Sequence, residues 1–188
     1  MTSLDPRSPL VLDTRELGRR AGSMKKVNLT VAAPADLVLA LVAVPEGSEV
    51  ELDVRLESVT EGVLVTGTAL VTVVGECSRC LEPLRFDREV DLQELFEYPD
   101  TDARGRVVES DDEDELPKIE GDLLDLEPTL RDAVVLALPL QPLCQSDCQG
   151  LCTQCGANLN DDPDHGHDTV DARWSALADL KVDTPNDN

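Results

Sequence analysis

The six cysteines of this chain fall into three pairs whose spacing suits metal binding. The first pair is Cys77 and Cys80, the middle pair is Cys144 and Cys148, and the last pair is Cys152 and Cys155. A tight Cys-x-x-Cys turn presents two thiolates to one ion, because backbone amides around the turn stabilise charge on the sulfurs. A structural zinc takes four such ligands in a tetrahedron. We therefore predict a structural zinc ion, with all six cysteines as candidate ligands.

The spacing leaves open which four thiols share the ion. We favour a zinc-ribbon-like site in which the first pair joins the last pair, where Gly156 follows the second knuckle. The first pair could instead join the middle pair, or the last four cysteines could form a site alone. Two neighbouring sites would need eight ligands, a number reached only with His165 and His167. For these histidines we favour a solvated turn in an Asp-rich loop over metal ligation.

A redox role for the first pair is the competing hypothesis. A thioredoxin-like pair lies at a helix N-terminus directly after a strand. Cys77 and Cys80 instead lie between two predicted strands and precede Pro83, which is typical of a hairpin knuckle. The chain contains no HExxH, no Gly-x-Ser-x-Gly and no Gly-rich phosphate loop. We therefore expect a protein that is not an enzyme, with a thiol-redox or metal-responsive protein using Cys77 and Cys80 as the alternative.

Alternating apolar residues predict the elements that position the cysteines. The pattern indicates a first strand over Val27–Val31 and three long strands over Glu49–Glu57, Val63–Gly75 and Leu84–Phe96. Consecutive antiparallel strands of this kind form a meander that curls into a twisted sheet or partial barrel. We predict the α+β class, with an antiparallel β-meander or partial barrel, flanking helices and a Cys-rich zinc-knuckle segment.

Three segments are predicted to be helical. Residues 10–22 read as a short helix that Gly22 ends, and a second helix begins at Pro128 and ends near Leu138. Thr169–Leu180 has the apolar stripe of a small amphipathic helix. Before the second helix, Ile119–Leu126 is expected to add a short strand.

Charge is unevenly distributed along the chain of 188 residues. The 16 Lys and Arg residues and 39 Asp and Glu residues give a net charge of −23, which argues against binding nucleic acid by general neutralisation of phosphates. Residues 1–30 are nevertheless basic, whereas residues 87–127 and the tail 156–188 are acidic. Four aromatic residues are too few to build a core, so we expect an aliphatic one.

The basic segment holds the candidate contacts for RNA or for an acidic partner. Arg15 and Arg19 would share one face of the predicted helix. No aromatic residue is interleaved for base stacking, so we favour an ordinary solvated face. The candidate contact residues are Arg15, Arg19, Arg20, Lys25 and Lys26.

These patterns predict four regions. Residues 1–30 form a basic helix or arm, and residues 31–98 form a sheet with the first cysteine pair at a hairpin tip. Residues 99–118 form an acidic flexible loop. Residues 119–188 contain a helix, the cysteine cluster and an amphipathic helix. We expect residues 31–188 to form one domain. No apolar run is long enough for a membrane span and no signal peptide is evident, so we expect a cytoplasmic protein with reduced thiols.

The segment from Asp122 to Asn160 resembles the signature of the YceD family of bacterial and plastid proteins. The similarity extends over roughly Val11 to Lys181. Its matching features are Asp125-Leu126, Leu136-Ala137-Leu138-Pro139, Leu143-Cys144, Gly150-Leu151-Cys152, Cys155-Gly156, Asn158-Leu159-Asn160, Cys77-x-x-Cys80-Leu81 with Pro83, and Asp171-x-Arg173-Trp174-x-x-Leu177.

The resemblance implies a function in large ribosomal subunit biogenesis. Members are needed for normal accumulation of 23S ribosomal RNA. They are regarded as predicted metal-binding and candidate nucleic-acid-binding proteins, with the cysteines as ligands and no established catalytic residues. The partner would be large-subunit rRNA or a basic ribosomal protein, and a net charge of −23 favours the protein. In our interpretation the metal holds the hairpin tip and the C-terminal segment together, so that metal loss unfolds the C-terminal third.

Overall fold

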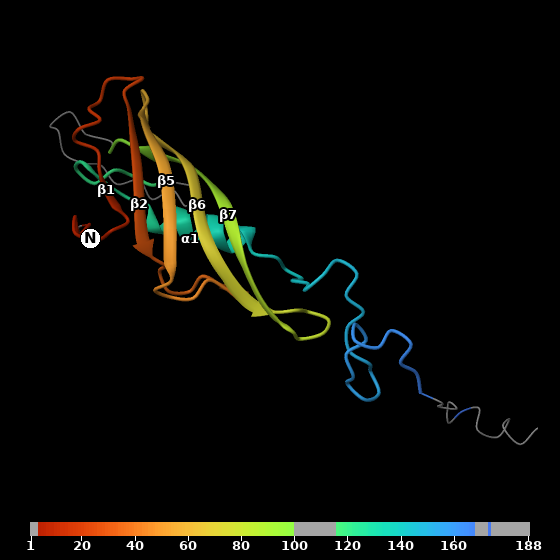
Figure 1. Ribbon diagram of the computed structural model, residues 1–188. Helices are drawn as coiled ribbons and strands as arrows, with labels where there is room; N and C mark the ends of the chain where they lie inside the picture. Colours follow the sequence, from red (N-terminus) through yellow and green to blue (C-terminus); the bar gives the residue numbers. More distant parts are fainter. Residues whose placement is uncertain (1–3, 100–115, 168–172, 174–188) are drawn as a thin grey trace, which may run out of the picture.

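A computed structural model describes residues 4–99, 116–167 and Arg173. An antiparallel sheet dominates these residues, and its strands follow the order β2-β5-β6-β4-β3, with β7 also paired to β6 (Figure 1). This arrangement confirms the predicted antiparallel meander within an α+β fold. The strands are β2 (Met24–Ala32), β3 (Val38–Leu39), β4 (Val42–Ala43), β5 (Glu49–Ser58), β6 (Gly62–Glu76) and β7 (Pro83–Glu97).

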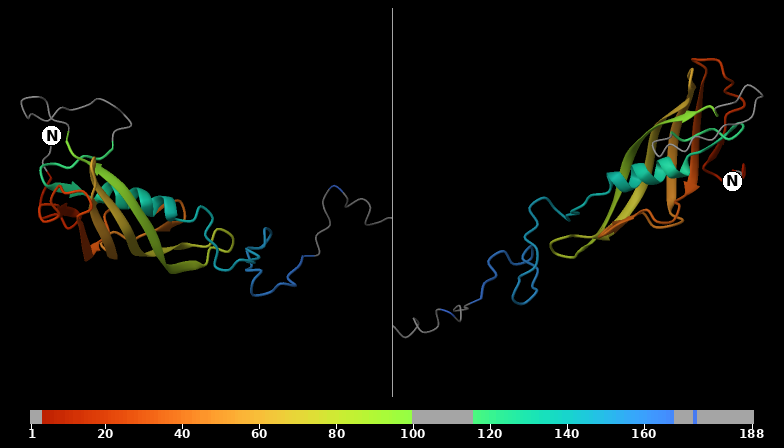
Figure 2. Two further views of the ribbon diagram at one scale, coloured as in Figure 1. Left: turned by 90° about the horizontal axis from the view of Figure 1, so that it is seen from above. Right: turned by 180° about the vertical axis from the view of Figure 1, so that it is seen from behind.

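Helix α1 (Glu127–Ala137) lies against one face of this sheet (Figures 1 and 2). The helix has proline in its first turn, as predicted, and its Leu130 and Val134 side chains are fully buried. The alternation of β5 directs its apolar side chains to the same core, with Val54 and Leu56 fully buried. A large aliphatic core therefore forms between the sheet and α1, and Phe96 is its largest fully buried side chain.

The opposite face of the sheet, which we call the open face, points toward the viewer in Figure 1. In the part of the chain that the structure describes, no helix covers it. Alternate residues of the long strands expose their side chains there, including Glu51, Asp53, Glu89 and Asp91. The sheet therefore has one apolar side and one side rich in carboxylates, as expected for strands with strict alternation.

The prediction of a helix over residues 10–22 is wrong. Strand β1 (Val11–Asp13) pairs with β8 (Leu123–Asp125) in a two-stranded antiparallel sheet, and turns follow β1. The side chains of Leu10, Leu12 and Leu17 are buried in the main core. Tertiary packing of these leucines thus outweighs the local helical pattern.

Several predicted segments are only partly visible. Strand β8 is shorter than the predicted strand over Ile119–Leu126. The predicted helix Thr169–Leu180 and most of the predicted acidic loop lie outside the described residues. After α1 the chain leaves the sheet and lies beside the tip of the β6–β7 hairpin (Figures 1 and 2).

Candidate metal centre

The tip of the β6–β7 hairpin is a compact turn that holds Cys77 and Cys80. The Cys77 amide donates to the Glu82 carbonyl at 2.8 Å, and the Leu81 amide donates to the Cys77 carbonyl at 3.0 Å. Leu81 has a positive φ of 62°, which closes the turn before β7 begins. These bonds fix two sulfurs on one side of the hairpin tip.

The middle cysteine pair reaches this tip because the chain after α1 is anchored to the hairpin. The Ser78 amide donates to the carbonyl of Pro142 at 2.8 Å. The Arg79 guanidinium donates to the carbonyl of Cys148 at 2.7 Å. At Gly150 φ is +81°, and a Cβ there would lie 3.1 Å from the Arg79 carbonyl oxygen, so glycine allows the close approach.

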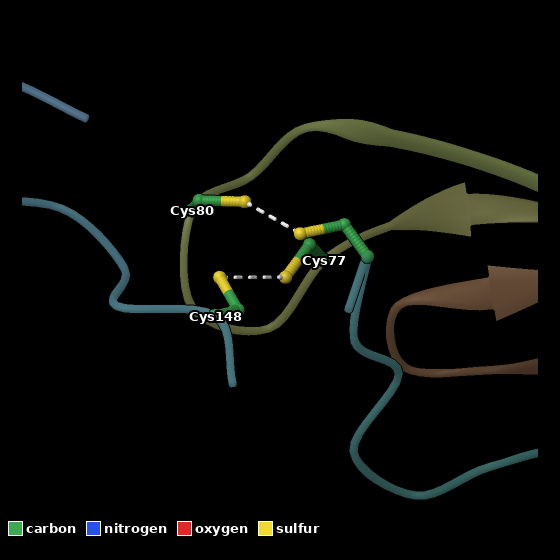
Figure 3. Close-up of side chains that lie close together, drawn as sticks. Cys77, Cys80 and Cys148 are labelled. Atoms are coloured by element: carbon green, nitrogen blue, oxygen red, sulfur yellow. Dashed lines mark hydrogen bonds between the residues drawn. The ribbon is translucent and has the colours of Figure 1, made fainter. Parts of the chain in front are cut away.

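Four sulfurs meet at the hairpin tip and form what we call the inner cluster: Cys77, Cys80, Cys144 and Cys148. All four Sγ atoms lie within 4.8 Å of one another. The Sγ atoms of Cys77 and Cys148 are 3.8 Å apart, and those of Cys80 and Cys144 are 3.5 Å apart. Figure 3 shows Cys77, Cys80 and Cys148 directed toward one another. A tetrahedral zinc with Zn–S bonds of about 2.3 Å needs sulfurs about 3.8 Å apart, so the spacing fits a metal ion.

The inner cluster sits in a small apolar core of its own. Cys77 and Cys148 are fully buried and Cys80 is buried, whereas Cys144 is exposed. This second core is separate from the main one, and its partly buried apolar neighbours are Leu84, Leu143 and Leu151. A four-sulfur set leaves no open coordination position, which is typical of a structural site and not of a catalytic one.

Hydrogen bonds lower the pKa of Cys77 and Cys148, whereas desolvation raises the pKa of Cys144. Burial disfavours the Cys77 thiolate, but backbone amides of the turn outweigh this effect and lower the pKa of Cys77 to about 6. A hydrogen bond from the Asn160 side chain lowers the pKa of Cys148. Although Cys144 as a residue is exposed, desolvation of its sulfur among the neighbouring thiols of Cys80 and Cys148 raises its pKa to about 12. Four sulfurs this close cannot all be ionised unless a cation compensates their charge.

The structure corrects the preferred pairing of cysteines. The first pair lies with the middle pair and not with the last pair. The bond from the Ser78 amide to Pro142 brings the middle pair to the hairpin tip, and the chain turns away at Gly150 before the last pair.

The last pair, Cys152 and Cys155, forms a second group with His165 and His167, which we call the outer group. The segment of these histidines does contain a turn and His167 is exposed, but both rings also contact cysteine sulfurs, which the interpretation as a solvated turn did not include.

Sequence reasoning missed two residues that support the inner cluster, Arg79 and Asn160. The Asn160 amide nitrogen lies 3.4 Å from the Cys148 sulfur, and its amide oxygen accepts from the Gln149 backbone at 2.8 Å. Arg79 stands inside the first knuckle, and Asn160 ends the Asn-Leu-Asn string that contributed to the family resemblance. The positions of Arg79 in the knuckle and of Asn160 in this string were therefore the sequence features that could have identified them.

Of the basic candidate residues, Lys25 and Lys26 lie within β2, and Arg15, Arg19 and Arg20 lie between β1 and β2. This segment is at the end of the sheet opposite the β6–β7 hairpin tip (Figure 1). Arg15 pairs with Asp122 at 3.4 Å, and Lys25 pairs with Glu16 at 2.9 Å. The Arg19 guanidinium stacks over the Tyr98 ring, 4.9 Å from its centroid. Arg15 and Arg19 do not share a helical face, because their segment is not helical. Arg20 and Lys26 are exposed.

Comparison with known proteins decides the family. The model of "Large ribosomal RNA subunit accumulation protein YceD" matches residues 65–181, a region that contains all six cysteines and both histidines. The chain belongs to the YceD family. No helix in the described part of this YceD protein has the length and apolar character needed to cross a bilayer.

Similar proteins occur in mycobacteria and in plants. An uncharacterized protein of Mycobacterium tuberculosis is 46% identical over 173 residues, which cover 92% of this chain and 82% of that protein. An uncharacterized protein of Mycobacterium leprae is 40% identical over 181 residues, covering 92% and 78%. The Arabidopsis thaliana protein named "Large ribosomal RNA subunit accumulation protein YCED homolog 1, chloroplastic" is 36% identical over 59 residues, covering 31% and 18%. No solved structure matches the chain.

Proposed function

We propose that this YceD family member is a non-enzymatic accessory factor for 23S rRNA accumulation, and that it acts in the cytoplasm during large ribosomal subunit biogenesis. The observation that carries the proposal is the inner cluster, within the region that the family model matches. A closed set of four sulfurs offers no position for a substrate, so its role is to hold the fold.

We assign zinc to the inner cluster as its structural ion. Thiolate ligands in a tetrahedron favour zinc among the common divalent ions. The ion joins two segments that lie 64 to 71 residues apart along the chain. Residues Cys77, Cys80, Cys144 and Cys148 hold the metal, and Arg79 and Asn160 orient the Cys148 segment.

We further infer that the direct partner is a basic ribosomal protein and not the rRNA itself. Arg15 and Lys25 form ion pairs with the protein's own carboxylates, which weakens the case for phosphate binding. On the open face, Glu51 of β5 and Glu89 of β7 flank the exposed Leu70 of β6 in one row of the sheet. Apolar surface between carboxylates complements a Lys- or Arg-rich segment.

A charge-reversal experiment tests this partner. The variant Glu51→Lys with Glu89→Lys should lose about tenfold or more in affinity for ribosomal proteins of the large subunit, because two attractive charges become repulsive. The control Glu46→Lys with Glu61→Lys changes the net charge equally at exposed positions between strands. Binding is measured at several salt concentrations against the protein fraction and against purified 23S rRNA. Recovery of rRNA instead of protein, or equal loss in both variants, would contradict the inference.

The role in rRNA accumulation is tested in cells that lack the endogenous protein. The variant Cys77→Ser with Cys80→Ser should fail to restore 23S rRNA levels, whereas Ser78→Ala should restore them. Purified protein should contain zinc bound by the inner cluster. A reversible Cys77–Cys80 disulfide in metal-free protein that still restores rRNA would instead support the redox hypothesis.

A further inference from the structure

The outer group brings four possible metal ligands together in a segment of only 16 residues, from Cys152 to His167. The Cys155 sulfur lies 3.1 Å from Nε2 of His165 and 3.2 Å from Nε2 of His167. The Cys152 sulfur lies 3.3 Å from Nε2 of His167. The two Nε2 atoms are 2.9 Å apart, so both imidazoles direct the same ring nitrogen to one point.

Local backbone bonds build much of this arrangement. The Gly156 amide donates to the Cys152 carbonyl at 2.8 Å, and the Cys152 amide donates to the Ala157 carbonyl at 2.8 Å. Gly156 has a φ of 75°, as the knuckle requires. The His165 amide closes a turn onto the Asp162 carbonyl at 3.1 Å. Two short turns thus position Cys152, Cys155 and His165, and His167 follows two residues after the second turn.

Hydrogen bonds among these four groups cannot satisfy all of them. A neutral imidazole has one protonated and one unprotonated nitrogen, and an uncharged thiol is only a weak donor. A tetrahedral zinc bound by two sulfurs and two nitrogens needs ligand separations of about 3.3 to 3.8 Å. The observed separations are a few tenths of an ångström shorter, so small outward movements make room for an ion.

We propose that Cys152, Cys155, His165 and His167 bind a second divalent metal ion of the zinc class, separate from the ion at the inner cluster. Two thiolates and two neutral imidazoles around a divalent ion give a neutral centre, whereas four thiolates give the inner centre a charge of −2. Cys155 and His167 are exposed, while three of the four inner ligands are buried. The outer ion therefore exchanges faster and can be removed alone.

Metal counting on the full chain tests the proposal. The variant His165→Asn with His167→Asn removes two ligands, and the control Asp161→Asn with Asp164→Asn changes the same loop at residues outside the outer group. We expect two zinc ions in the natural protein and in the control, and one in the histidine variant. Circular dichroism of each protein reports whether the sheet is retained.

Cobalt substitution identifies the ligands. Thiolate-to-cobalt charge-transfer absorption scales with the number of bound thiolates, so it should fall to about two-thirds in the histidine variant, from six thiolates to four. One ion in the natural protein that the histidine variant still binds, or two ions retained in the histidine variant, would overturn the second centre.

A further variant separates this proposal from the role assigned to the inner cluster. Cys77→Ser with Cys80→Ser should lose the inner ion and keep one ion with a spectrum of two sulfurs and two nitrogens. If the natural protein binds only this outer ion, the inner zinc fails and the second centre stands. If this variant binds no ion while the histidine variant keeps one, the second centre fails and the inner zinc stands.

Discussion

Asn160 shows how a residue that follows the last cysteine in sequence can contact the inner cluster. It lies after Cys155 in sequence, yet its amide contacts the sulfur of Cys148 in the inner cluster and the backbone of Gln149. Asn158 in turn accepts from the Asn160 side chain at 2.8 Å. A residue that hydrogen-bonds a metal ligand fixes the orientation of that ligand and stabilises its thiolate.

Replacing Asn160 by alanine should therefore weaken metal binding at the inner cluster. We expect a loss of about 10- to 100-fold in affinity, measured by competition with a chromophoric chelator. Asn28→Ala is a matched control, because Asn28 is exposed on the sheet. Equal affinities in the two variants would show that Asn160 has no influence on the ion.

The cysteine spacing identified all six sulfurs as candidate ligands but did not predict which of them meet. Three pairings were compatible with the spacing, and we favoured the first pair with the last pair. The distinguishing contact is a backbone bond from Ser78 to Pro142, which no side-chain pattern encodes. The sequence did not predict that His165 and His167 lie beside the last pair for a similar reason, since their loop is polar and its backbone conformation brings the rings to the sulfurs.

At the scale of elements, α1 is the main cover of the sheet's apolar face. Its Leu130 is fully buried, whereas Leu136, farther along the same helix, is 85% exposed. Most ends of the long strands were predictable to within one or two residues, because strictly alternating apolar and polar residues fit a strand and do not fit a helix. Residues 10–22 were not, because the burial of Leu12 and Leu17 depends on distant β8 and on the main core.

The two leucines of α1 provide a paired test of this packing. Leu130→Ala should lower the free energy of unfolding by about 2–5 kcal/mol, because it removes buried apolar contacts and leaves a cavity. Leu136→Ala should change it by no more than about 0.5 kcal/mol. Urea unfolding of zinc-loaded protein measures both values. Similar losses in the two variants would mean that α1 does not bury the face that carries Leu130.

At the scale of the whole molecule, the separation between the main core and the small core around the inner cluster decides what metal loss would unfold. The main core includes α1, while the inner cluster has its own small apolar surroundings at the hairpin tip. The expectation that metal loss unfolds the entire C-terminal third is therefore too broad. Binding of a structural zinc contributes on the order of 10 kcal/mol, but mainly to the segment that the metal holds.

Removing the metal should accordingly unfold part of the molecule and leave the rest intact. We expect chelation to abolish amide-exchange protection in residues 139–167 and at the hairpin tip, while β5, β6 and α1 stay protected. Hydrogen exchange with mass spectrometry measures this difference. Loss of protection in β5 and β6 as well would show that the sheet depends on the metal.

The distance along the chain between the two halves of the inner cluster also affects the order of events during translation. Cys80 precedes Cys144 by 64 residues. At about 5–20 residues per second, a ribosome needs several seconds to synthesise that interval. During this time Cys77 and Cys80 of the nascent hairpin lack Cys144 and Cys148, the other two sulfurs of the inner cluster. Until the remaining sulfurs emerge, the reduced state of the pair depends on the reducing environment that we expect around the protein.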